Sequence, residues 1–413
     1  MGIRDGLLGW ASRLGWGRRQ ETPIARPGRS HGSAIPSREW PNPTIPLIDL
    51  SGSAPALNRS RFEAIHPKLS LDLIPTPKGN PDLREALYHH NLTRWSGATK
   101  GGFLPTQGAT GAFQAIANAF INRGDPVIVC DPGCPSHASI LGHRGAQIRH
   151  LGVTLDHEGA LSFSESELAR LAPGARMLVI SQPNNPDGGL WAAEALDALK
   201  GWAKRNEWLV IVDETYADFI PLALRDSGIW RTGWNERALF VGSLSKSHPA
   251  PGTRVGWVQG PEKWTQAIER VIHLQGSEVS WQAEQAALRV LAGPGVAGDF
   301  LQKMEATRAL AESQLKGLGM CPSPAQAGMF LWMPTWNLAA SSKNLARDWK
   351  DSCLVSVAPG ERFGPLSMGH IRLNLAADHA RLAEGLKRLK AWSEGEMHLD
   401  SDSWSGWSGR QAA

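Results

Sequence analysis

Four residues that can do chemistry together lie just after the apolar run 238–241 in this 413-residue chain. They are Ser243, Ser245, Lys246 and Arg254. The apolar run predicts a strand, which would deliver all four side chains to one place. A lysine among apolar neighbours and other cations can lose its proton and attack a carbonyl group to form a Schiff base. Hydroxyl groups and a guanidinium can hold a phosphate. The residues thus suit a phosphorylated carbonyl ligand, but on their own they leave a solvated basic turn equally open.

This stretch resembles the cofactor-lysine segment of the class I and II aminotransferases, a family of fold-type I pyridoxal 5'-phosphate (PLP) enzymes. The resemblance implies that Lys246 forms the Schiff base, an aldimine, with the cofactor. It also implies that Ser243, Ser245 and Arg254 hold the cofactor's phosphate. Pro249 departs from the family pattern, which has a small or aliphatic residue there. Because proline fixes φ and lacks an N–H group, we expect the loop to follow a different path locally.

A second informative stretch is an apolar run, 208–212, that ends in Asp213. Ligands of open α/β sheets bind at the carboxyl ends of the strands, where this carboxylate would lie. A strand-end acid alone is more often a metal ligand or a cap. The resemblance implies instead that Asp213 keeps the cofactor's pyridinium nitrogen protonated, which makes the ring an electron sink. It also implies that Tyr216 donates a hydrogen bond to the 3'-oxygen of the cofactor.

Small residues lead into a helical pattern over 112–120. Gly108, Ala109 and Thr110 would lie at the start of that helix, where free N–H groups and a partial positive charge bind phosphate. Glycine-rich helix starts are common, so this motif alone is weak evidence for a phosphate site. Its similarity to the family's phosphate turn implies that the three residues face the phosphate from the side opposite Arg254.

Two loops carry further cofactor contacts that the resemblance implies. Cys134 stands where relatives usually stack an aromatic residue on the pyridine ring, and we interpret it as a passive ring contact rather than a redox or nucleophilic group. Cofactor binding should then weaken by roughly 1 kcal/mol, unless His137 or a tryptophan packs on the ring. Asn185 lies in a turn similar to the family's N-P-T-G, with Asp187 in the threonine position, and would donate to the 3'-oxygen. Asn-Pro and Asp-Gly are also ordinary turn formers.

The substrate side of the predicted site depends on Arg372, in the apolar run 371–375. An unpaired charge is unfavourable in such a setting, so the residues alone leave a core-edge salt bridge and an anion site equally open. The resemblance implies that Arg372 binds the substrate α-carboxylate through a bidentate pair. Asn185 and Ser53 would adjoin the substrate, with Ser53 in place of a usual glycine. Ile74 replaces a tyrosine that reaches the partner subunit's phosphate, so one contact between subunits should be missing.

Predicted strands and helices alternate from about residue 100 to 260, a pattern typical of a parallel α/β sheet. With the resemblance, this predicts a fold-type I PLP-transferase. Such a fold has a mostly parallel central sheet in a large domain, and a smaller α+β domain built from the N- and C-terminal parts. A helix over about 293–318 should link the two. The expected divisions are an N-terminal arm and linker at 1–45, the N-terminal part of the small domain at 46–78, the large PLP-binding domain at 79–292, the C-terminal small domain at 293–395 and a disordered tail at 396–413.

Composition sets broad limits on the function. Hydrophobic residues make up 42% of the chain and charged residues 20%, as in globular proteins, and the net charge of +4 gives no argument for nucleic acid. The four cysteines have neither CxxC nor zinc spacing, so we expect no metal site and reduced thiols in the cytoplasm. No apolar run could span a bilayer. The basic N-terminal pattern favours a loose arm, or one packed on a second subunit, over membrane contact.

Together these features predict a PLP-dependent aminotransferase that moves an amino group between an L-amino acid and a 2-oxo acid by way of the Lys246 aldimine. A lyase or decarboxylase on the same scaffold is the alternative, because fold and cofactor do not fix which bond at the α-carbon breaks. The missing aromatic residues at Ile74 and Cys134 favour that alternative more than usual. A catalytically inert PLP-binding or regulatory protein fits less well, since the polar groups at the cofactor's reactive end are all present. The resemblance implies a homodimer, and the sequence does not indicate which amino acid is the substrate.

Overall fold

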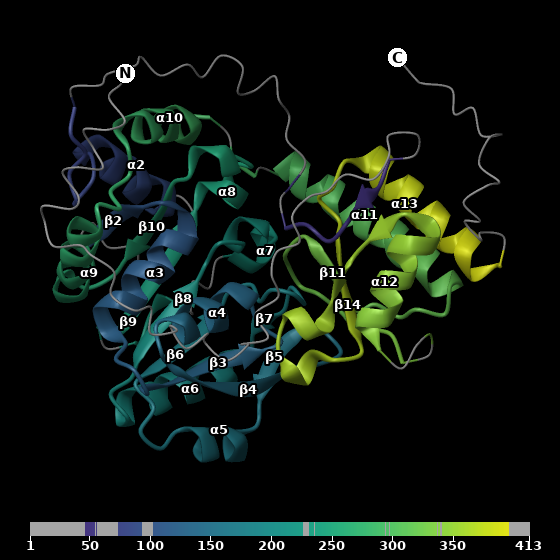
Figure 1. Ribbon diagram of the computed structural model, residues 1–413, viewed down its shortest axis with the longest axis horizontal. Helices are drawn as coiled ribbons and strands as arrows, with labels where there is room; N and C mark the ends of the chain where they lie inside the picture. The colour runs from purple at the N-terminus through teal and green to yellow at the C-terminus, as the bar shows by residue number, and fades with distance from the viewer. Residues whose placement is uncertain are drawn as a thin grey trace, which may run out of the picture. The chain divides into compact units, whose positions relative to one another are not determined.

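The computed structural model describes most of the chain (Figure 1). The described residues are 46–53, 55, 73–92, 102–225, 231–234, 236–293, 295–296, 298–336, 338 and 341–395. The predicted arm at 1–45 and the predicted tail at 396–413 therefore lie outside the described residues. Within the described part, no helix combines the length and apolarity that crossing a membrane requires.

A nine-stranded sheet forms the centre of the large domain, in the order β2-β10-β9-β8-β6-β3-β4-β5-β7. Its strands are β2 (Phe103–Thr106), β3 (Pro126–Asp131), β4 (Gln147–Leu155), β5 (Ala160–Phe163), β6 (Met177–Ser181), β7 (Leu190–Trp191), β8 (Leu209–Asp213), β9 (Ala238–Ser243) and β10 (Gly256–Gln259). The run β9-β8-β6-β3-β4 is parallel, as is β5-β7. Strand β10 is antiparallel to both neighbours, and β4 is antiparallel to β5. The sheet is thus mostly parallel, as the sequence predicted.

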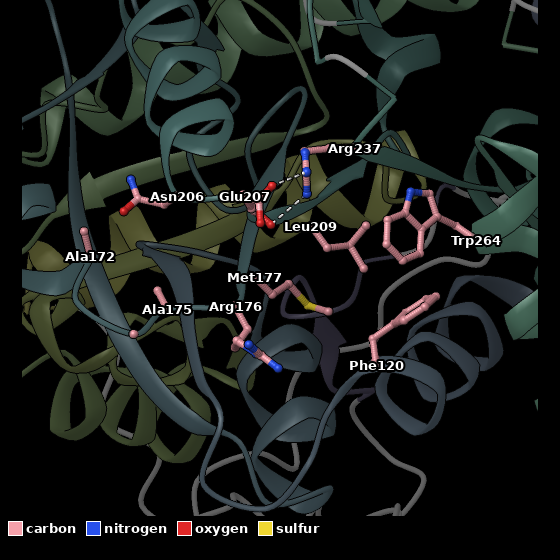
Figure 2. A pocket seen from close by; sticks show the side chains of 11 residues that line it. Phe120, Ala172, Ala175, Arg176, Met177, Asn206, Glu207, Leu209, Arg237 and Trp264 are labelled. Carbon is pink, nitrogen blue, oxygen red and sulfur yellow. Dashed lines mark hydrogen bonds and ion pairs between the residues drawn. The ribbon is translucent and has the colours of Figure 1, made fainter.

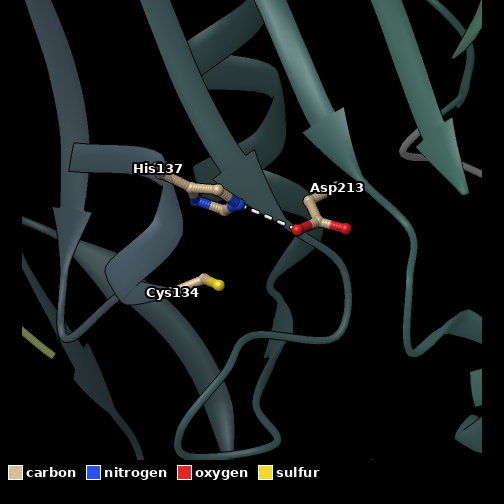
Figure 3. A group of neighbouring side chains, drawn as sticks. All are labelled: Cys134, His137 and Asp213. Atoms are coloured by element: carbon tan, nitrogen blue, oxygen red, sulfur yellow. Dashed lines mark hydrogen bonds and ion pairs between the residues drawn. The ribbon is translucent and has the colours of Figure 1, made fainter. Parts of the chain in front are cut away.

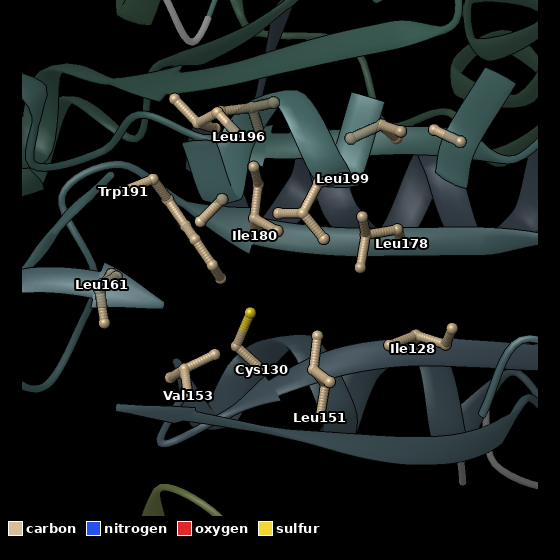
Figure 4. Packing of buried hydrophobic residues seen from close by; sticks show 14 of the residues in the cluster. Ile128, Cys130, Leu151, Val153, Leu161, Leu178, Ile180, Trp191, Leu196 and Leu199 are labelled. Carbon is tan, nitrogen blue, oxygen red and sulfur yellow. The ribbon is translucent and has the colours of Figure 1, made fainter. Parts of the chain in front are cut away.

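Helices cover both faces of this sheet because its central strands are apolar on both sides. The large-domain helices are α2 (Pro81–Leu92), α3 (Gly108–Phe120), α4 (Pro135–His143), α5 (Glu165–Leu171), α6 (Ala193–Arg205), α7 (Leu222–Arg225), α8 (Leu244–Ser247), α9 (Glu262–Gln275) and α10 (Trp281–Leu291), with short 3-10 turns η2 (Ala217–Phe219) and η4 (Pro251–Thr253). Successive strand residues point to opposite faces. In β6, Leu178 and Ile180 pack with α5 and α6 (Figure 4), whereas Met177 and Val179 pack with α3 and α9.

The small domain combines segments from both ends of the described chain. Strand β1 (Ile48–Asp49) pairs in parallel with β12 (Val355–Ser356), and a second sheet has the order β11-β14-β13. The remaining elements are β11 (Phe330–Pro334), β13 (Ala358–Pro359), β14 (His370–Asn374), α11 (Gly298–Gly317), α12 (Ser342–Cys353), α13 (His379–Ser393), η5 (Gly360–Arg362) and η6 (Pro365–Ser367). This arrangement confirms the predicted α+β character of the domain, while the exact domain boundaries remain predictions.

The helix expected over about 293–318 begins later than the sequence indicated. Helix α10 ends at Leu291, and the next helix, α11, starts at Gly298. The Gly-Pro-Gly sequence at 293–295 disfavours helical backbone, because glycine is costly in a helix and proline lacks the N–H donor. Several other helices begin where a side chain caps the first turn, accepting a hydrogen bond from the backbone N–H three residues later. These caps are Ser164, Ser280, Ser341 and Asp378.

Candidate active site

Most of the predicted site residues lie at or just beyond the carboxyl ends of the parallel strands. Asp213 ends β8 and Ser243 ends β9, while Cys134 and Asn185 lie in the loops after β3 and β6. Parallel pairing places these strand ends at one edge of the sheet, where ligands of α/β sheets bind. The short helix α8 continues directly from β9 and carries Lys246. The fold therefore brings together residues that are far apart in the sequence.

The amine of Lys246 is largely enclosed. Its Nζ donates to the backbone carbonyl of Ser53, lies 3.5 Å from the Ser53 hydroxyl and is 5.9 Å from the centre of the Tyr216 ring. Burial lowers the pKa of Lys246 to about 8, and the nearby positive charges of Arg372 and Arg254 act in the same direction. A lysine with such a pKa supplies a neutral amine near neutral pH, which suits a nucleophile or a general base.

Tyr216 lies in the same enclosed region and keeps its proton. Burial raises the pKa of Tyr216 well above its ordinary value. The ring packs edge-on against Phe330, with ring centres 5.3 Å apart. Its hydroxyl is therefore a hydrogen-bond donor throughout the physiological pH range. The predicted role at a 3'-oxygen needs such a donor, and that role remains a prediction.

Asp213 is buried and is held by two hydrogen-bond donors (Figure 3). Its Oδ2 lies 2.8 Å from Nε2 of His137, and its Oδ1 accepts a hydrogen bond of 2.9 Å from the backbone N–H of Thr215. Burial alone would raise the pKa of Asp213, but the contacts with His137 and Thr215 outweigh burial and the pKa is lowered. The carboxylate is consequently ionised at neutral pH and can pair with a protonated ring nitrogen.

The sequence did not identify His137 as a partner of Asp213. His137 lies in the first turn of α4, and its imidazole stacks on Phe113 with ring centres 4.5 Å apart. Its stacking partner is thus a core phenylalanine, and its Nε2 is directed to Asp213 (Figure 3). The available signal was a histidine three residues after Cys134. That spacing becomes informative only once α4 is known to begin at Pro135.

Cys134, His137 and Asp213 also offer three ligand atoms within 4.8 Å of one another (Figure 3). A metal ion would require the thiolate form of the cysteine. Burial raises the pKa of Cys134, and the charge of Asp213 raises it further. The thiol form is therefore favoured, which agrees with our expectation of no metal here, although that expectation remains a prediction.

The predicted phosphate turn lies at the N-terminus of α3, beside Arg254. Gly108 is the first residue of α3 and has φ +71, and a Cβ there would lie 2.8 Å from Nη2 of Arg254. A side chain at Gly108 would thus fill the space between helix and guanidinium. A cation next to a helix N-terminus is unfavourable, because that end carries a partial positive charge. An anion between Arg254 and the free N–H groups of α3 would relieve this repulsion, so the arrangement fits a phosphate group.

Ser243 and Ser245 lie close to this turn, but the Ser243 hydroxyl already has backbone partners. Its Oγ accepts a hydrogen bond of 3.2 Å from the N–H of Ser245 and donates one of 3.4 Å to the carbonyl of Val255. Ser243 is therefore the N-cap of α8, a local role that the sequence analysis did not assign. Contacts of either serine with a phosphate remain predictions.

Arg372 is a buried cation of the small domain. It occupies β14, and its guanidinium lies 4.0 Å from the ring centre of Phe330 and 4.8 Å from that of Phe363. Burial lowers the pKa of Arg372 to about 10, so it remains charged at neutral pH. Its Nη1 donates to Asn185 Oδ1 over 2.8 Å, and its Nη2 donates to the carbonyl of Ser51 over 2.8 Å.

No carboxylate pairs with Arg372 among the residues that the structure describes. Its Nη2 also donates to the carbonyl of Gly52, over 3.2 Å. A guanidinium has five N–H donors, and these three bonds leave about two of them, including Nε, for a ligand. Burying a charge without a counter-ion is costly, so this geometry favours the anion site over the core-edge salt bridge that the sequence left open.

The turn that carries Asn185 is fixed by Asp187. The Asp187 carboxylate accepts hydrogen bonds from Asn184 Nδ2 at 2.8 Å and from the N–H of Gly189 at 2.9 Å. Burial raises the pKa of Asp187 to about 6. Because Asn185 uses its side-chain oxygen to accept from Arg372, its Nδ2 group points elsewhere and can donate to a ligand.

A separate hollow of about 410 Å³ lies at the opposite edge of the large sheet (Figure 2). Strands β6, β8 and β9 begin there, so it is at their amino ends. It contains none of the predicted site residues. The residues that line it are Phe120, Ala172, Gly174, Ala175, Arg176, Met177, Asn206, Glu207, Leu209, Arg237 and Trp264.

Comparisons with known proteins agree with this geometry. The family model described as aminotransferase class I and II matches residues 56–389. The chain is 30% identical over 293 residues to the arginine–pyruvate transaminase AruH of Pseudomonas aeruginosa, covering 68% of this chain and 72% of the relative. It is 25% identical over 336 residues to the glutamate–pyruvate aminotransferase AlaC of Escherichia coli, covering 79% and 81%. A solved single mutant of Thermus thermophilus aspartate aminotransferase has a TM-score of 0.74 at 24% identity, covering 83% of this chain and 91% of that one.

These findings confirm the predicted fold class, the PLP cofactor and amino-group transfer, and they give no support to a lyase or decarboxylase. Aminotransferases related to this chain bind amino-acid and oxo-acid substrates. The chain belongs to the class I and II aminotransferases, and it is a PLP-dependent transferase of amino groups.

Proposed function

We propose that this protein moves an amino group from an L-amino acid to a 2-oxo acid, with Lys246 as its proton-transferring base and Arg372 as its α-carboxylate site. The observation that carries the proposal is the buried amine of Lys246. Burial lowers its pKa to about 8, in an enclosure where the charges of Asp213 and Arg372 also act on it. About a tenth of such an amine is neutral at pH 7, which is enough for a general base.

The guanidinium of Arg254 beside the N-terminus of α3 supports the fit of this site to PLP most directly, because the two together can hold a phosphate. When bound, PLP supplies an electron-withdrawing ring that stabilises negative charge at the substrate's α-carbon. The residues proposed to hold it are, for the phosphate, Gly108, Ala109, Thr110, Ser243, Ser245 and Arg254; for the ring nitrogen, Asp213 supported by His137; for the 3'-oxygen, Asn185 and Tyr216; and for one ring face, Cys134.

Asp213 and Tyr216 have the protonation states that their proposed roles need, and Lys246 has a neutral fraction that can act as a base. Asp213 is anionic because its hydrogen bonds lower its pKa despite burial. Tyr216 remains a donor because burial raises its pKa. Lys246 Nζ takes the proton from the α-carbon of the amino acid, and in the reverse half of the cycle it returns a proton to the α-carbon of the incoming acid. Ser53, whose carbonyl accepts from Lys246, lies beside the point where this proton moves.

The carboxylate of the substrate is proposed to bind Arg372. The aromatic rings of Phe330 and Phe363 fix the guanidinium plane, and the bonds to Asn185 and Ser51 fix its rotation. A preorganised fork of this kind binds a carboxylate without first having to be ordered. Relatives act, by their names, on arginine and pyruvate, glutamate and pyruvate, or aspartate, so the side chain of this protein's substrate is left to experiment.

We also propose a cytoplasmic homodimer. Ile74, in the position where relatives reach the partner subunit, is 90% exposed, and Leu274 is 84% exposed. The proposed dimer rests on membership of the family, and these exposed apolar side chains are candidates for its interface. The four cysteines are free thiols, as expected in a reducing compartment.

The test of the proposed function is a half-reaction. PLP-loaded protein is mixed with arginine, glutamate, aspartate or alanine, one at a time and without an oxo acid, and the products are quantified. Amino transfer predicts about one equivalent of 2-oxo acid per subunit, with further turnover only after pyruvate or another oxo acid is added. Release of ammonia or carbon dioxide in its place would contradict the proposal.

A further inference from the structure

We propose that Asp131 is a positioning residue for substrate binding, because it fixes the segment Gly360–Ser367 against the loop that carries Cys134. This inference rests on the proposed role of Arg372 as the carboxylate site. Asp131 is the last residue of β3, in the large domain, and the segment Gly360–Ser367 belongs to the small domain.

The Asp131 carboxylate is 1% exposed and is shared between two donors of that segment. Its Oδ2 accepts a hydrogen bond of 2.9 Å from the N–H of Leu366, and its Oδ1 accepts one of 2.6 Å from the hydroxyl of Ser367. On the other side, Nδ1 of His150 lies 3.3 Å from Oδ2. A buried carboxylate is costly unless it is paired in this way, so the contact is well defined.

Two backbone features allow the close approach. Gly364 has φ +142, and a Cβ at this position would collide with the Asp131 carboxyl group. Only glycine therefore leaves room for the carboxylate. The N–H of Gly133 also donates to the carbonyl of Phe363 over 2.9 Å, so the two loops are joined at a further point.

These contacts close a ring of residues around Arg372. The Phe363 ring lies on the Arg372 guanidinium at 4.8 Å, within the segment that Asp131 holds. On the large-domain side, the carbonyl of Pro132 accepts a hydrogen bond of 3.1 Å from Asn184, whose neighbour Asn185 accepts from Arg372. Asp131 thus holds the segment that carries Phe363, an aromatic contact of Arg372. The loop after Asp131 supports Asn185, a hydrogen-bond partner of Arg372, through Asn184.

The proposed contacts with the cofactor's phosphate and ring nitrogen lie away from this joint, whereas Cys134 and Asn185 adjoin it. Among the described residues, the hydrogen bonds of Lys246, Asp213 and Arg254 involve segments other than Asp131 and its loop or the Gly360–Ser367 segment. Loss of the Asp131 contacts should therefore loosen the carboxylate site more than the contacts with the cofactor's phosphate and ring nitrogen, which supply most of the proposed cofactor binding. A purely structural role would instead lower stability without separating substrate binding from cofactor binding.

The test uses the PLP-loaded enzyme and the substitution Asp131→Asn. Asparagine keeps the size of the side chain but directs an NH2 group at one of the two donors that the carboxylate now accepts from. We expect the KM of the best amino donor to rise about tenfold, with kcat and the PLP dissociation constant each within about threefold of wild type. Ser367→Ala removes one of the two bonds and should raise KM in the same direction, by about threefold. It serves as the test if Asp131→Asn does not fold.

Glu361→Gln is the matched control, since it also removes one negative charge, and Glu361 lies in the segment that Asp131 holds. Glu361 bonds to the hydroxyl of Ser342 at 2.6 Å and to the N–H of Lys343, so it faces α12 rather than Asp131. The KM of the Glu361→Gln enzyme for the same amino donor should stay within about twofold of wild type. The inference would be overturned if KM were unchanged in both Asp131→Asn and Ser367→Ala. It would also be overturned if KM and the PLP dissociation constant changed equally, or if KM rose as much in Glu361→Gln as in Asp131→Asn. A wild-type enzyme without amino transfer would instead count against the proposed function.

Discussion

The two ends of the parallel strands differ in how they hold charged side chains. Beyond the carboxyl ends, Asp213 and Arg372 are buried, and each is held by hydrogen bonds from distant segments. At the amino ends, beside the hollow in Figure 2, Glu207 and Arg237 form an ion pair of 3.0 Å whose side chains are 76% and 30% exposed. The same sheet therefore removes charge from water at the carboxyl ends of its strands and leaves this ion pair in contact with water at their amino ends.

This difference shows why a hollow alone does not mark an active site. Water screens the exposed pair of Glu207 and Arg237, which contributes about 0.2–1 kcal/mol to stability. At the other end, burial lowers the pKa of Lys246 to about 8 and that of Arg372 to about 10. Shifted pKa values require desolvation and fixed partners, and these are the conditions under which side chains move protons or select ligands.

Removal of the buried amine should have the largest effect. Lys246→Ala leaves no group to take the substrate's α-proton, so we expect kcat for amino transfer to fall by roughly 10³-fold or more. Borohydride should also no longer fix the cofactor covalently to the protein. Lys200→Ala, at a lysine of α6 that pairs with Asp197 outside the candidate site, is the control and should retain activity. Full activity of Lys246→Ala would contradict the conclusion that the buried charges at the carboxyl ends of the strands carry out the reaction.

Loss of the buried guanidinium should act on binding. Arg372→Ala removes the proposed partner of the substrate carboxylate, so we expect kcat/KM for the amino acid to fall by about 100-fold, mostly through KM. Affinity for PLP should change by less than about threefold, as measured by equilibrium titration of the cofactor-free protein. A larger effect on PLP than on the amino acid would place Arg372 in the cofactor site instead.

The partner of Asp213 should change the pH dependence. Hydrogen bonds from His137 and Thr215 outweigh burial and lower the pKa of Asp213, so its carboxylate charge is retained as the pH falls. His137→Ala removes a hydrogen bond that lowers the pKa of Asp213. Burial, which raises this pKa, is then less compensated, and the pKa of Asp213 rises. The acid limb of the kcat/KM profile should therefore move to higher pH, with about a tenfold loss at pH 6 and a smaller loss at pH 8. The same acid limb in both proteins would show that His137 does not tune Asp213.

What the sequence could predict depended on whether a feature is formed by neighbouring residues or by residues far apart in the chain. Contiguous patterns were informative, because apolar runs predicted β8 and β9, which the structure confirms. The roles of Asp213 and Lys246, which follow these runs, came from the family resemblance and remain predictions. The glycine at the start of α3 was identified for the same reason, since its role depends on local backbone geometry.

Contacts between distant segments were not predicted. His137 and Asp213 are 76 residues apart, and Asp131 and Ser367 are 236 apart, so only the folded arrangement brings each pair together. Ser243 shows that a local contact can be missed as well. The resemblance assigned its hydroxyl to a phosphate, which remains a prediction, but did not predict that the hydroxyl also bonds to the backbone N–H of Ser245 and the carbonyl of Val255.

The exposed ion pair should give the smallest effect. Glu207→Gln breaks the 3.0 Å contact with Arg237, but Arg237 keeps its bond to the backbone carbonyl of residue 207. We expect the free energy of unfolding to change by less than about 0.5 kcal/mol and kcat/KM to remain at the wild-type value. Chemical denaturation and steady-state kinetics measure the two quantities. A tenfold loss of activity in Glu207→Gln would mean that the amino ends of the strands also serve the reaction, since the carboxylate there is too exposed to matter through stability alone.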